Sequence, residues 1–266
     1  MAQRFAGKVA WITGGGSGIG RALAVELARQ GARVAVSGRR ADRLADAVRA
    51  VEAEGVEGLA VACDVRKDDA VRDAVAAVVA RFGQLDVAVA NAGFSVAGRV
   101  AKLSGDDWRR QLDTNVVGAA LTARYALPEL EKTAGRIGLV GSVSAFLCSP
   151  GFAAYSASKF ALRALGLTLA AELHGTGVSC TLLHPGYVAS EIAQVDNEGT
   201  FRAERQDKRP RLLMWPAEKA ARVMARALAD RRRELVFTGH GKVGAFMGQH
   251  LPGLVHVALR KAPKAR

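Results

Sequence analysis

The chain has 266 residues, half of them hydrophobic, and a formal net charge of +13. This length and composition suit a single α/β domain with a large buried core. Sixteen Lys or Arg residues, against five Asp or Glu, fall within residues 202–266, so the rest of the chain is close to neutral and an extended nucleic-acid-binding surface is not expected.

The first part of the sequence predicts a β-α-β unit with a glycine-rich turn. Strands are expected at residues 8–13 and 33–37, with a helix at 21–30 between them. Gly14, Gly18 and Gly20 follow the first strand. Because glycine has no side chain, this turn would let a pyrophosphate approach backbone amides at a helix N-terminus, where the helix dipole favours negative charge. The alternative is a tight turn that needs glycine for its geometry alone.

The end of the second strand indicates which nucleotide binds. Sites that select NAD place an acidic residue there, about twenty residues past the glycines. In this chain Gly38 takes that position, and Arg39 and Arg40 follow it. Two guanidinium groups suit a 2′-phosphate, since each charge-assisted hydrogen bond is worth about 1.5–3 kcal/mol. We therefore predict NADP(H) rather than NAD(H), with solvated arginines at a helix start as the alternative.

The middle of the chain continues the alternation of strands and helices. The expected elements are a strand at residues 56–62, a helix at 69–81, a strand at 85–90 and a helix at 108–130. The first of these strands leads into Cys63-Asp64-Val65, and the second leads into Asn91-Ala92-Gly93. Asn115 lies inside the long helical pattern among apolar neighbours. A buried amide is costly unless it is hydrogen-bonded, so Asn115 is expected to have a specific partner.

The stretch that follows carries the candidate chemistry. A strand is predicted at residues 137–140 and a helix at 155–174. Tyr155 and Lys159 are one helical turn apart, so they share a face. Lowering the pKa of a tyrosine from about 10 by roughly three units takes about 4 kcal/mol. One ammonium at about 4 Å, at an effective dielectric constant near 20, supplies about that much. Ser142, just after the strand, can point its hydroxyl into the same space.

The last third is predicted to contain a strand at 178–183, a charged loop at 191–215, a helix at 216–229 and a strand at 234–238. Such a long loop in a compact domain is usually functional or mobile. Val243, Phe246, Met247 and Leu251 then form an apolar stripe at helical spacing, which resumes at residues 254–259 before a basic end. We expect this tail to pack on the chain itself or on a partner subunit. An anionic membrane surface and, less favoured, a nucleic acid are the alternatives.

These motifs, in this order, resemble the short-chain dehydrogenase/reductase family. They are Thr-Gly-Gly-Gly-Ser-Gly-Ile-Gly at residues 13–20, Asn115 in Thr-Asn-Val-Val-Gly, and Ser142, Tyr155 and Lys159. The resemblance covers about residues 8–186, and more loosely up to 238. It implies one α/β domain over residues 1–238, with a Rossmann-type doubly wound seven-stranded parallel sheet and helices on both faces. It also implies a substrate lid at about 187–215, which leaves residues 239–266 as a basic amphipathic tail.

The resemblance assigns the catalytic roles. Tyr155 exchanges a proton with the substrate oxygen, and Ser142 hydrogen-bonds that oxygen. Lys159 binds the nicotinamide ribose and lowers the tyrosine pKa, while Asn115 holds a water in a proton relay that reaches the lysine. Ser144 is the alternative to Ser142, but the family's thirteen-residue interval to the tyrosine favours Ser142. The alternative for Asn115 is a buried amide that ties its helix to a loop.

The resemblance also assigns cofactor binding. The expected residues are Gly14, Gly16, Ser17, Gly18, Ile19, Gly20, Arg39, Arg40, Asp64, Val65, Asn91, Ala92, Gly93, Tyr155, Lys159, Pro185, Gly186 and Val188. Asp64 would hydrogen-bond the adenine, with capping of the next helix as a second reading. Val188 would offer its backbone to the carboxamide. Two positions depart from the family pattern, since Ala90 replaces an asparagine and Ser190 stands where threonine is commoner. His184 is expected to be structural.

The expected activity is NADP(H)-dependent interconversion of an alcohol and a ketone or aldehyde. An apolar substrate is favoured by the pocket positions, which are Phe94, Phe146, Cys148 and Tyr187. A non-catalytic NADP(H)-binding regulatory or scaffold protein is the main alternative. Epimerisation or dehydration of a nucleotide sugar is another, but about eighty residues after Gly186 leave little room for the extra substrate domain. The apolar faces of helix 155–174 favour a homodimer or homotetramer.

The remaining signals concern location and metals. Three cysteines form an odd set without paired spacing, which favours free thiols in a reducing compartment. The opening residues lack the apolar segment of a signal peptide, and no run of about 18 uncharged apolar residues occurs. The five histidines show no zinc-site spacing. We therefore expect a cytoplasmic protein without a spanning helix or a metal site.

Overall fold

A seven-stranded sheet with only parallel strand pairs forms the centre of the computed structural model, which describes residues 3–207 and 209–260. The strands are Val9–Thr13 (β1), Arg33–Gly38 (β2), Gly58–Ala62 (β3), Val87–Ala90 (β4), Arg136–Val140 (β5), Ser179–His184 (β6) and Glu234–Val236 (β7). Their order across the sheet is β3-β2-β1-β4-β5-β6-β7. This confirms the predicted doubly wound Rossmann-type fold.

The order of the strands indicates where a ligand would bind. The chain runs outward from β1 to β2 and β3, and then returns to the other side of β1 to begin β4. In open parallel sheets ligands bind at such a reversal, outside the carboxyl ends of the strands. The carboxyl end of β1 leads into the glycine-rich turn, and the carboxyl end of β5 leads into Ser142. Both predicted halves of the site therefore lie at the same edge of the sheet.

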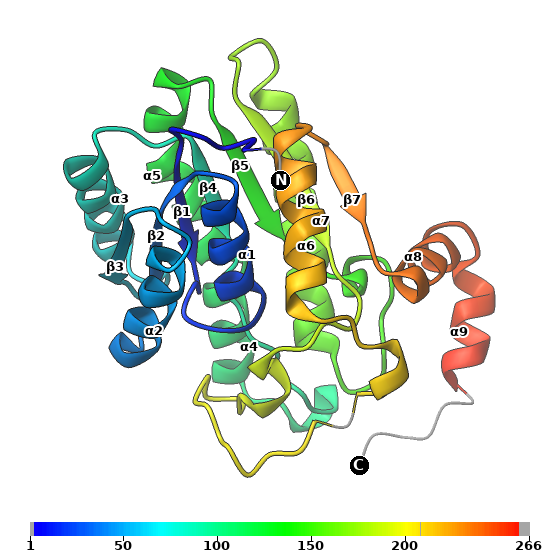
Figure 1. Cartoon of the computed structure of the whole chain (residues 1–266). Coiled ribbons are helices and arrows are strands. Elements are labelled where there is room, and N and C mark those ends of the chain that lie inside the picture. Colours follow the sequence, from blue (N-terminus) through cyan, green and yellow to red (C-terminus); the bar gives the residue numbers. More distant parts are fainter. Residues whose placement is uncertain (1–2, 208, 261–266) are drawn as a thin grey trace.

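Helices cover both faces of the sheet (Figure 1), and an apolar cluster lies on each face. The helices are Gly18–Arg29 (α1), Ala41–Glu52 (α2), Asp68–Phe82 (α3), Gly105–Leu112 (α4), Gly118–Lys132 (α5), Ala153–Glu172 (α6), Ala217–Ala229 (α7), Gly239–His250 (α8) and Pro252–Arg260 (α9). Successive strand residues point to opposite faces, so Ile12 packs with α1, α2 and α7 while Trp11 packs with α3, α5 and α6. The buried Trp11 indole also donates to Ser37 Oγ at 2.7 Å.

The helix predicted at 108–130 is divided in the structure. Helix α4 ends at Leu112, residues Asp113–Val117 form a π-helical turn, and α5 begins at Gly118. A wider turn of this kind rotates the side chains that follow it and is frequent at functional sites. Gly118 packs so close to Val65 that a Cβ atom there would lie 2.6 Å from Val65 Cγ2. The interruption turns the Asn115 side chain into the interior.

The tail packs on the chain, but not through the apolar stripe that was predicted to pack, and packing of that stripe on a partner subunit stays a prediction. Helix α8 contacts the rest of the chain through its small residues, since a Cβ atom at Gly244 would lie 2.8 Å from Leu147 Cδ1. The larger apolar side chains face outward, with Val243 64% and Phe246 59% exposed. Figure 1 shows α8 and α9 extending from the β7 edge of the molecule. Residues 261–266 of the predicted tail lie outside the described residues.

Within the described parts of the chain, no helix combines the length and the apolar character needed to cross a membrane.

Candidate active site

The three proposed catalytic side chains meet where β5 ends and α6 begins. Lys159 is almost fully buried, and its Nζ donates to the Val140 carbonyl at 2.9 Å. The same nitrogen lies 5.7 Å from the centre of the Tyr155 ring. Ser142 Oγ accepts from the Ser144 amide at 3.1 Å, and the Ser142 hydroxyl is close enough to influence the Tyr155 phenol. Helix and strand therefore hold the trio together without help from the lid.

The expected depression of the Tyr155 pKa by Lys159 does not hold in this structure. Burial raises the pKa of Tyr155 above its ordinary value, and the Ser142 hydroxyl and the Arg209 charge oppose that rise in part. Burial of the phenol is the largest cause of this rise, and the Lys159 ammonium donates to the Val140 carbonyl at the strand end. Tyr155 is therefore protonated near neutral pH, as a proton donor must be.

Burial also changes the amine of Lys159. Its pKa falls to about 8 because the surroundings disfavour the charged form. A single backbone carbonyl compensates only part of that cost. Near neutral pH the group remains mainly an ammonium, with donors left over for a ligand hydroxyl.

A buried chain of polar side chains supports Ser142 from behind. His184 is fully buried, with Nδ1 3.2 Å from the Ser142 carbonyl oxygen and Nε2 3.0 Å from Glu234 Oε1. Arg163 of α6 binds the same carboxylate through Nε at 2.6 Å and Nη2 at 3.2 Å. A Cβ atom at Gly141 would clash with the His184 ring. The network joins β5, β6, β7 and α6 directly beneath the candidate site, in agreement with the structural role expected for His184.

Asn115 ties the π-helical turn to two parts of the site. Its Nδ2 donates to the Phe94 carbonyl and to Ser158 Oγ, both at 3.0 Å, and its Oδ1 accepts from the Phe94 amide at 3.1 Å. Ser158 in turn donates to the Tyr155 carbonyl at 2.7 Å. The side chain therefore connects its helix to a loop, which was the alternative role considered for Asn115 in the sequence analysis. A proton relay through Asn115 stays a prediction.

The glycine-rich turn could hold a pyrophosphate, because its glycines bring bare backbone close to the start of α1. Gly14 and Gly18 have φ values of 65° and 50°, which disfavour residues with side chains. A Cβ atom at Gly14 would lie 2.8 Å from Ala92 Cα. Ser17 precedes α1 without capping it, and the first turn carries no acidic residue. Free amides at a helix N-terminus, closely approached by bare backbone, fit the phosphates of a dinucleotide.

Asn91 stabilises that turn from the end of β4. Its Nδ2 donates to the carbonyls of Thr13 and Gly14 at 2.9 and 3.1 Å, and its amide donates to Thr13 Oγ1 at 3.1 Å. The amide of Ala92 donates to the same hydroxyl at 3.2 Å. The Asn91 side chain is therefore used in shaping the cradle, while Gly93 beside it is exposed.

The two arginines after β2 lie at the adenosine end of the predicted cofactor groove. Arg40 Nη2 donates to Ser17 Oγ at 3.2 Å, so the guanidinium sits beside the glycine-rich turn. Arg39 Nη2 donates to the Gly199 carbonyl at 2.7 Å. Both side chains reach across from the sheet to neighbouring segments, and neither is simply a solvated charge.

Asp64 does not cap the next helix, so that second reading was wrong. Helix α3 begins at Asp68 with Lys67 at its cap position. The Asp64 carboxylate instead accepts from the backbone amide of Arg66 at 3.1 Å and pairs with its guanidinium, which lowers the carboxylate pKa. Contact between Asp64 and an adenine stays a prediction.

The turn after β6 is held from both sides. The Val188 carbonyl accepts from Arg209 Nη1 at 3.0 Å, and the Ser190 carbonyl accepts from Arg209 Nη2 at the same distance. The Tyr187 amide donates to His240 Nε2 at 2.9 Å, so the first turn of α8 seats on this segment. The Val188 carbonyl is thus bonded to Arg209, and contact between the Val188 backbone and a carboxamide stays a prediction.

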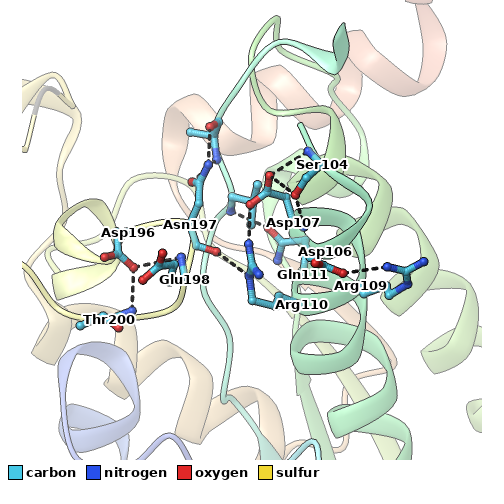
Figure 2. A network of polar contacts seen from close by, with 12 residues as sticks. Ser104, Asp106, Asp107, Arg109, Arg110, Gln111, Asp196, Asn197, Glu198 and Thr200 are labelled. Carbon is cyan, nitrogen blue, oxygen red and sulfur yellow. Dashed lines mark hydrogen bonds and ion pairs between the residues drawn. The ribbon is translucent and has the colours of Figure 1, made fainter. Parts of the chain in front are cut away.

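The lid lies closed against the body of the protein. Asn197 pairs with both backbone groups of Ala97, through Oδ1 and Nδ2, at 3.0 Å each. Arg110 of α4 donates to the Asn197 carbonyl at 3.1 Å (Figure 2). Figure 2 also shows Asp196 accepting from the amides of Glu198 and Thr200, which folds the lid tip into a tight turn. The lid therefore has specific anchors and does not form a featureless loop.

Several residues of the site were not identified from the sequence. They are Thr13, Arg163, Glu191, Arg209, Glu234 and His240. Apart from Thr13, these residues act through partners far away in the chain, so no local spacing could reveal them. Thr13 could have been identified, because it is the last residue of the strand before the glycines and belongs to the motif itself.

Comparisons with known proteins agree with this architecture. The sequence profile described as short chain dehydrogenase matches residues 8–200. A 3beta-hydroxysteroid dehydrogenase of Mediterraneibacter gnavus is 37% identical over 183 residues, which are 68% of this chain and 66% of that protein.

Two solved structures are similar over nearly their whole length. A short chain dehydrogenase/reductase of Burkholderia phymatum in complex with NAD has a TM-score of 0.81 and 28% identity, covering 99% of this chain and 98% of that one. A short chain dehydrogenase of Burkholderia cenocepacia in complex with NADP has a TM-score of 0.79 and 30% identity, covering 90% and 99%. Similar structures thus hold either nicotinamide nucleotide.

Proposed function

The chain belongs to the short-chain dehydrogenase family of oxidoreductases, and from that premise we propose that it uses NADP(H) to interconvert an alcohol and a ketone or aldehyde on an apolar substrate. The observation that carries the proposal is the cluster of Ser142, Tyr155 and Lys159 at the carboxyl edge of the sheet. A non-catalytic role in binding NADP(H) would not require these three side chains to converge.

Each residue has a defined task in the proposed reaction. A bound nicotinamide ring would supply or accept the hydride. Tyr155 would give its phenolic proton to the carbonyl oxygen, and the Ser142 hydroxyl would donate a hydrogen bond to the same atom. The buried Lys159 ammonium would hold the ribose hydroxyls with its remaining donors. Asn115 would fix the turn that carries Tyr155, through Ser158.

The protonation of the site favours reduction. Burial keeps the pKa of Tyr155 above its ordinary value, so the phenol holds its proton at neutral pH and is ready to donate it. Of the four pocket positions predicted from the sequence, Phe94 and Phe146 are buried against the protein itself. Cys148 and Tyr187 are exposed, and the apolar substrate remains part of the proposal. The test is oxidation of NADPH with a panel of apolar ketones and aldehydes. No turnover with any of them, combined with normal NADPH binding, would favour the non-catalytic alternative.

Removing either arginine after β2 should erase the preference for NADPH. Arg39→Ala and Arg40→Ala are each expected to weaken NADPH binding about tenfold and to leave NADH binding within about twofold, because only the 2′-phosphate differs. Titration of both cofactors by fluorescence measures this. Arg49→Ala is the matched control, since Arg49 is an exposed arginine of α2 paired only with Asp46 among the described residues. An unchanged ratio in both variants would contradict the assignment.

We propose a cytoplasmic homodimer or homotetramer. The three cysteines are free, which suits a reducing compartment. Helix α6 leaves Phe160 43% exposed on its outer face, and Val117 before α5 is 44% exposed, as expected of helices that pack on a second copy. A monomer in analytical ultracentrifugation would contradict the oligomer.

For the tail we propose contact with an anionic membrane surface. Leu254 and Val257 of α9 are more than half exposed, like the outward residues of α8. Residues 235–266 contain five Lys or Arg and no Asp or Glu. A two-fold contact between tails of two copies would bring these cations together, whereas acidic lipids would attract them.

The full chain should sediment with vesicles that contain phosphatidylserine and not with phosphatidylcholine alone. Replacing Phe246 and Leu254 by serine should reduce the bound fraction at least about tenfold, since each change removes an apolar anchor. Val100→Ser, which alters an exposed residue outside the tail, should have no effect. Equal sedimentation of the tail variant and the wild type, or failure of both to sediment, would rule out the membrane contact.

A further inference from the structure

The two arginines proposed for the 2′-phosphate are both bonded to the lid. Arg40 Nη2 donates to Glu191 Oε2 at 2.6 Å, and Arg39 Nη2 donates to the Gly199 carbonyl at 2.7 Å. The partners are 151 and 160 positions apart in the sequence. The lid therefore reaches the two arginines that follow β2.

Glu191 lies at the centre of this contact. Its second carboxylate oxygen is 3.8 Å from Arg43 Nη2, so the carboxylate bridges two guanidinium groups. The lid begins directly on the glycine-rich turn, since a Cβ atom at Gly18 would lie 3.0 Å from Ser190 Cβ. The position of Glu191 is thus fixed by the same turn that would hold the cofactor phosphates.

The Arg40 guanidinium has three partners, two of them in the lid. Besides Glu191 it binds Ser17 Oγ at 3.2 Å, and its guanidinium carbon lies 5.6 Å from the centre of the Phe201 ring. A phosphate monoester and a carboxylate both seek the planar donor fork of an arginine. A 2′-phosphate bound to Arg40 would therefore meet the negative charge of Glu191 at close range, and like charges repel.

We propose that Glu191 sets the cofactor selectivity by competing with the 2′-phosphate for Arg40. The inference rests on the proposed use of NADP(H). It adds an internal anion that lowers affinity for the phosphorylated nucleotide and leaves the unphosphorylated one unaffected. Arg43, already within 4 Å of Glu191, is the cation to which the displaced carboxylate can turn.

Binding of two fragments separates the effect of the phosphate from the rest of the cofactor. Isothermal titration with 2′,5′-ADP and with 5′-AMP is measured on the wild type, Glu191→Gln and Glu198→Gln. We expect Glu191→Gln to bind 2′,5′-ADP about fivefold more tightly, a size suited to a partly exposed ion pair. Its affinity for 5′-AMP should stay within about twofold, which also shows that the fold is intact.

Glu198→Gln is the matched control. Glu198 belongs to the same lid, and its carboxylate forms no ion pair with any residue that the structure describes. It should leave both affinities unchanged. A wild-type preference for 2′,5′-ADP that Glu191→Gln leaves unchanged or weakens would overturn the inference and leave the cofactor proposal standing. A preference that is absent in the wild type and emerges only in Glu191→Gln would contradict the cofactor proposal and support the inference.

Discussion

Replacing Tyr155 by phenylalanine should lower turnover by about 10³-fold or more while NADPH still binds. The change deletes one oxygen and keeps the ring that packs beneath the Lys159 amine. Because the phenol is the proposed donor of the proton to the carbonyl oxygen, the contribution of general acid catalysis is lost. Single-turnover oxidation of NADPH and direct NADPH titration measure the two effects separately.

Ser144→Ala is the control for this experiment. Ser144 was the alternative to Ser142, and it contributes only its backbone amide to the hydrogen bond with Ser142 Oγ, so its hydroxyl should be dispensable. Full activity in Tyr155→Phe would refute the mechanism. Loss of NADPH binding together with activity would instead assign Tyr155 to cofactor binding.

Replacing Glu234 by glutamine should cost about 2–3 kcal/mol of unfolding free energy at pH 7. Hydrogen bonds from His184 and Arg163 lower the pKa of Glu234 from 4.5 to about 2, and every tenfold change in proton affinity corresponds to about 1.4 kcal/mol. The full shift would correspond to about 3.5 kcal/mol, and screening by solvent at this partly exposed carboxylate reduces the expected cost to about 2–3 kcal/mol. The folded state prefers the ionised form, so this stability is complete above about pH 5. It is lost as the pH falls through 4.5 towards 2.

Urea unfolding at several pH values tests this expectation. The wild type should lose stability between about pH 5 and pH 2, and Glu234→Gln should have a flatter profile over the same interval. Glu54→Gln removes a carboxylate paired with the half-exposed Arg29 at the surface, and should cost less than about 1 kcal/mol. Equal losses in the two variants would show that the network at Glu234 adds no more than a surface ion pair.

Features with a local pattern were predictable from the sequence. The alternation of apolar strands and helices gave the sheet, and the spacing of Gly14, Gly18 and Gly20 gave the turn. The interval from Tyr155 to Lys159 placed both on one face because a helix has 3.6 residues per turn. The same interval could not reveal that the Val140 carbonyl, 19 residues upstream, binds the amine. Nor could it reveal that burial of the phenol raises the Tyr155 pKa, contrary to the prediction.

Features formed by distant residues were not predictable. Glu234 meets His184 and Arg163 only because β7 is added beside β6, and Glu191 meets Arg40 only because the lid returns over the glycine-rich turn. The tail shows a second reason why sequence-based prediction failed. Its stripe of large side chains suggested a buried face, but the glycines of α8 allow the closest approach of backbone to backbone, and the structure packs that face instead.

The bond between Lys159 and the Val140 carbonyl has a consequence for how such an enzyme can change over generations. It joins the helix of the proton donor to the strand that ends beside Ser142, so the spacing of the reacting groups is fixed by the scaffold. Substitutions in residues 191–215 can then alter the surroundings of the site without disturbing that spacing. Substrate preference can therefore change through residues 191–215, while Ser142, Tyr155 and Lys159 keep the same positions and the same proton transfer.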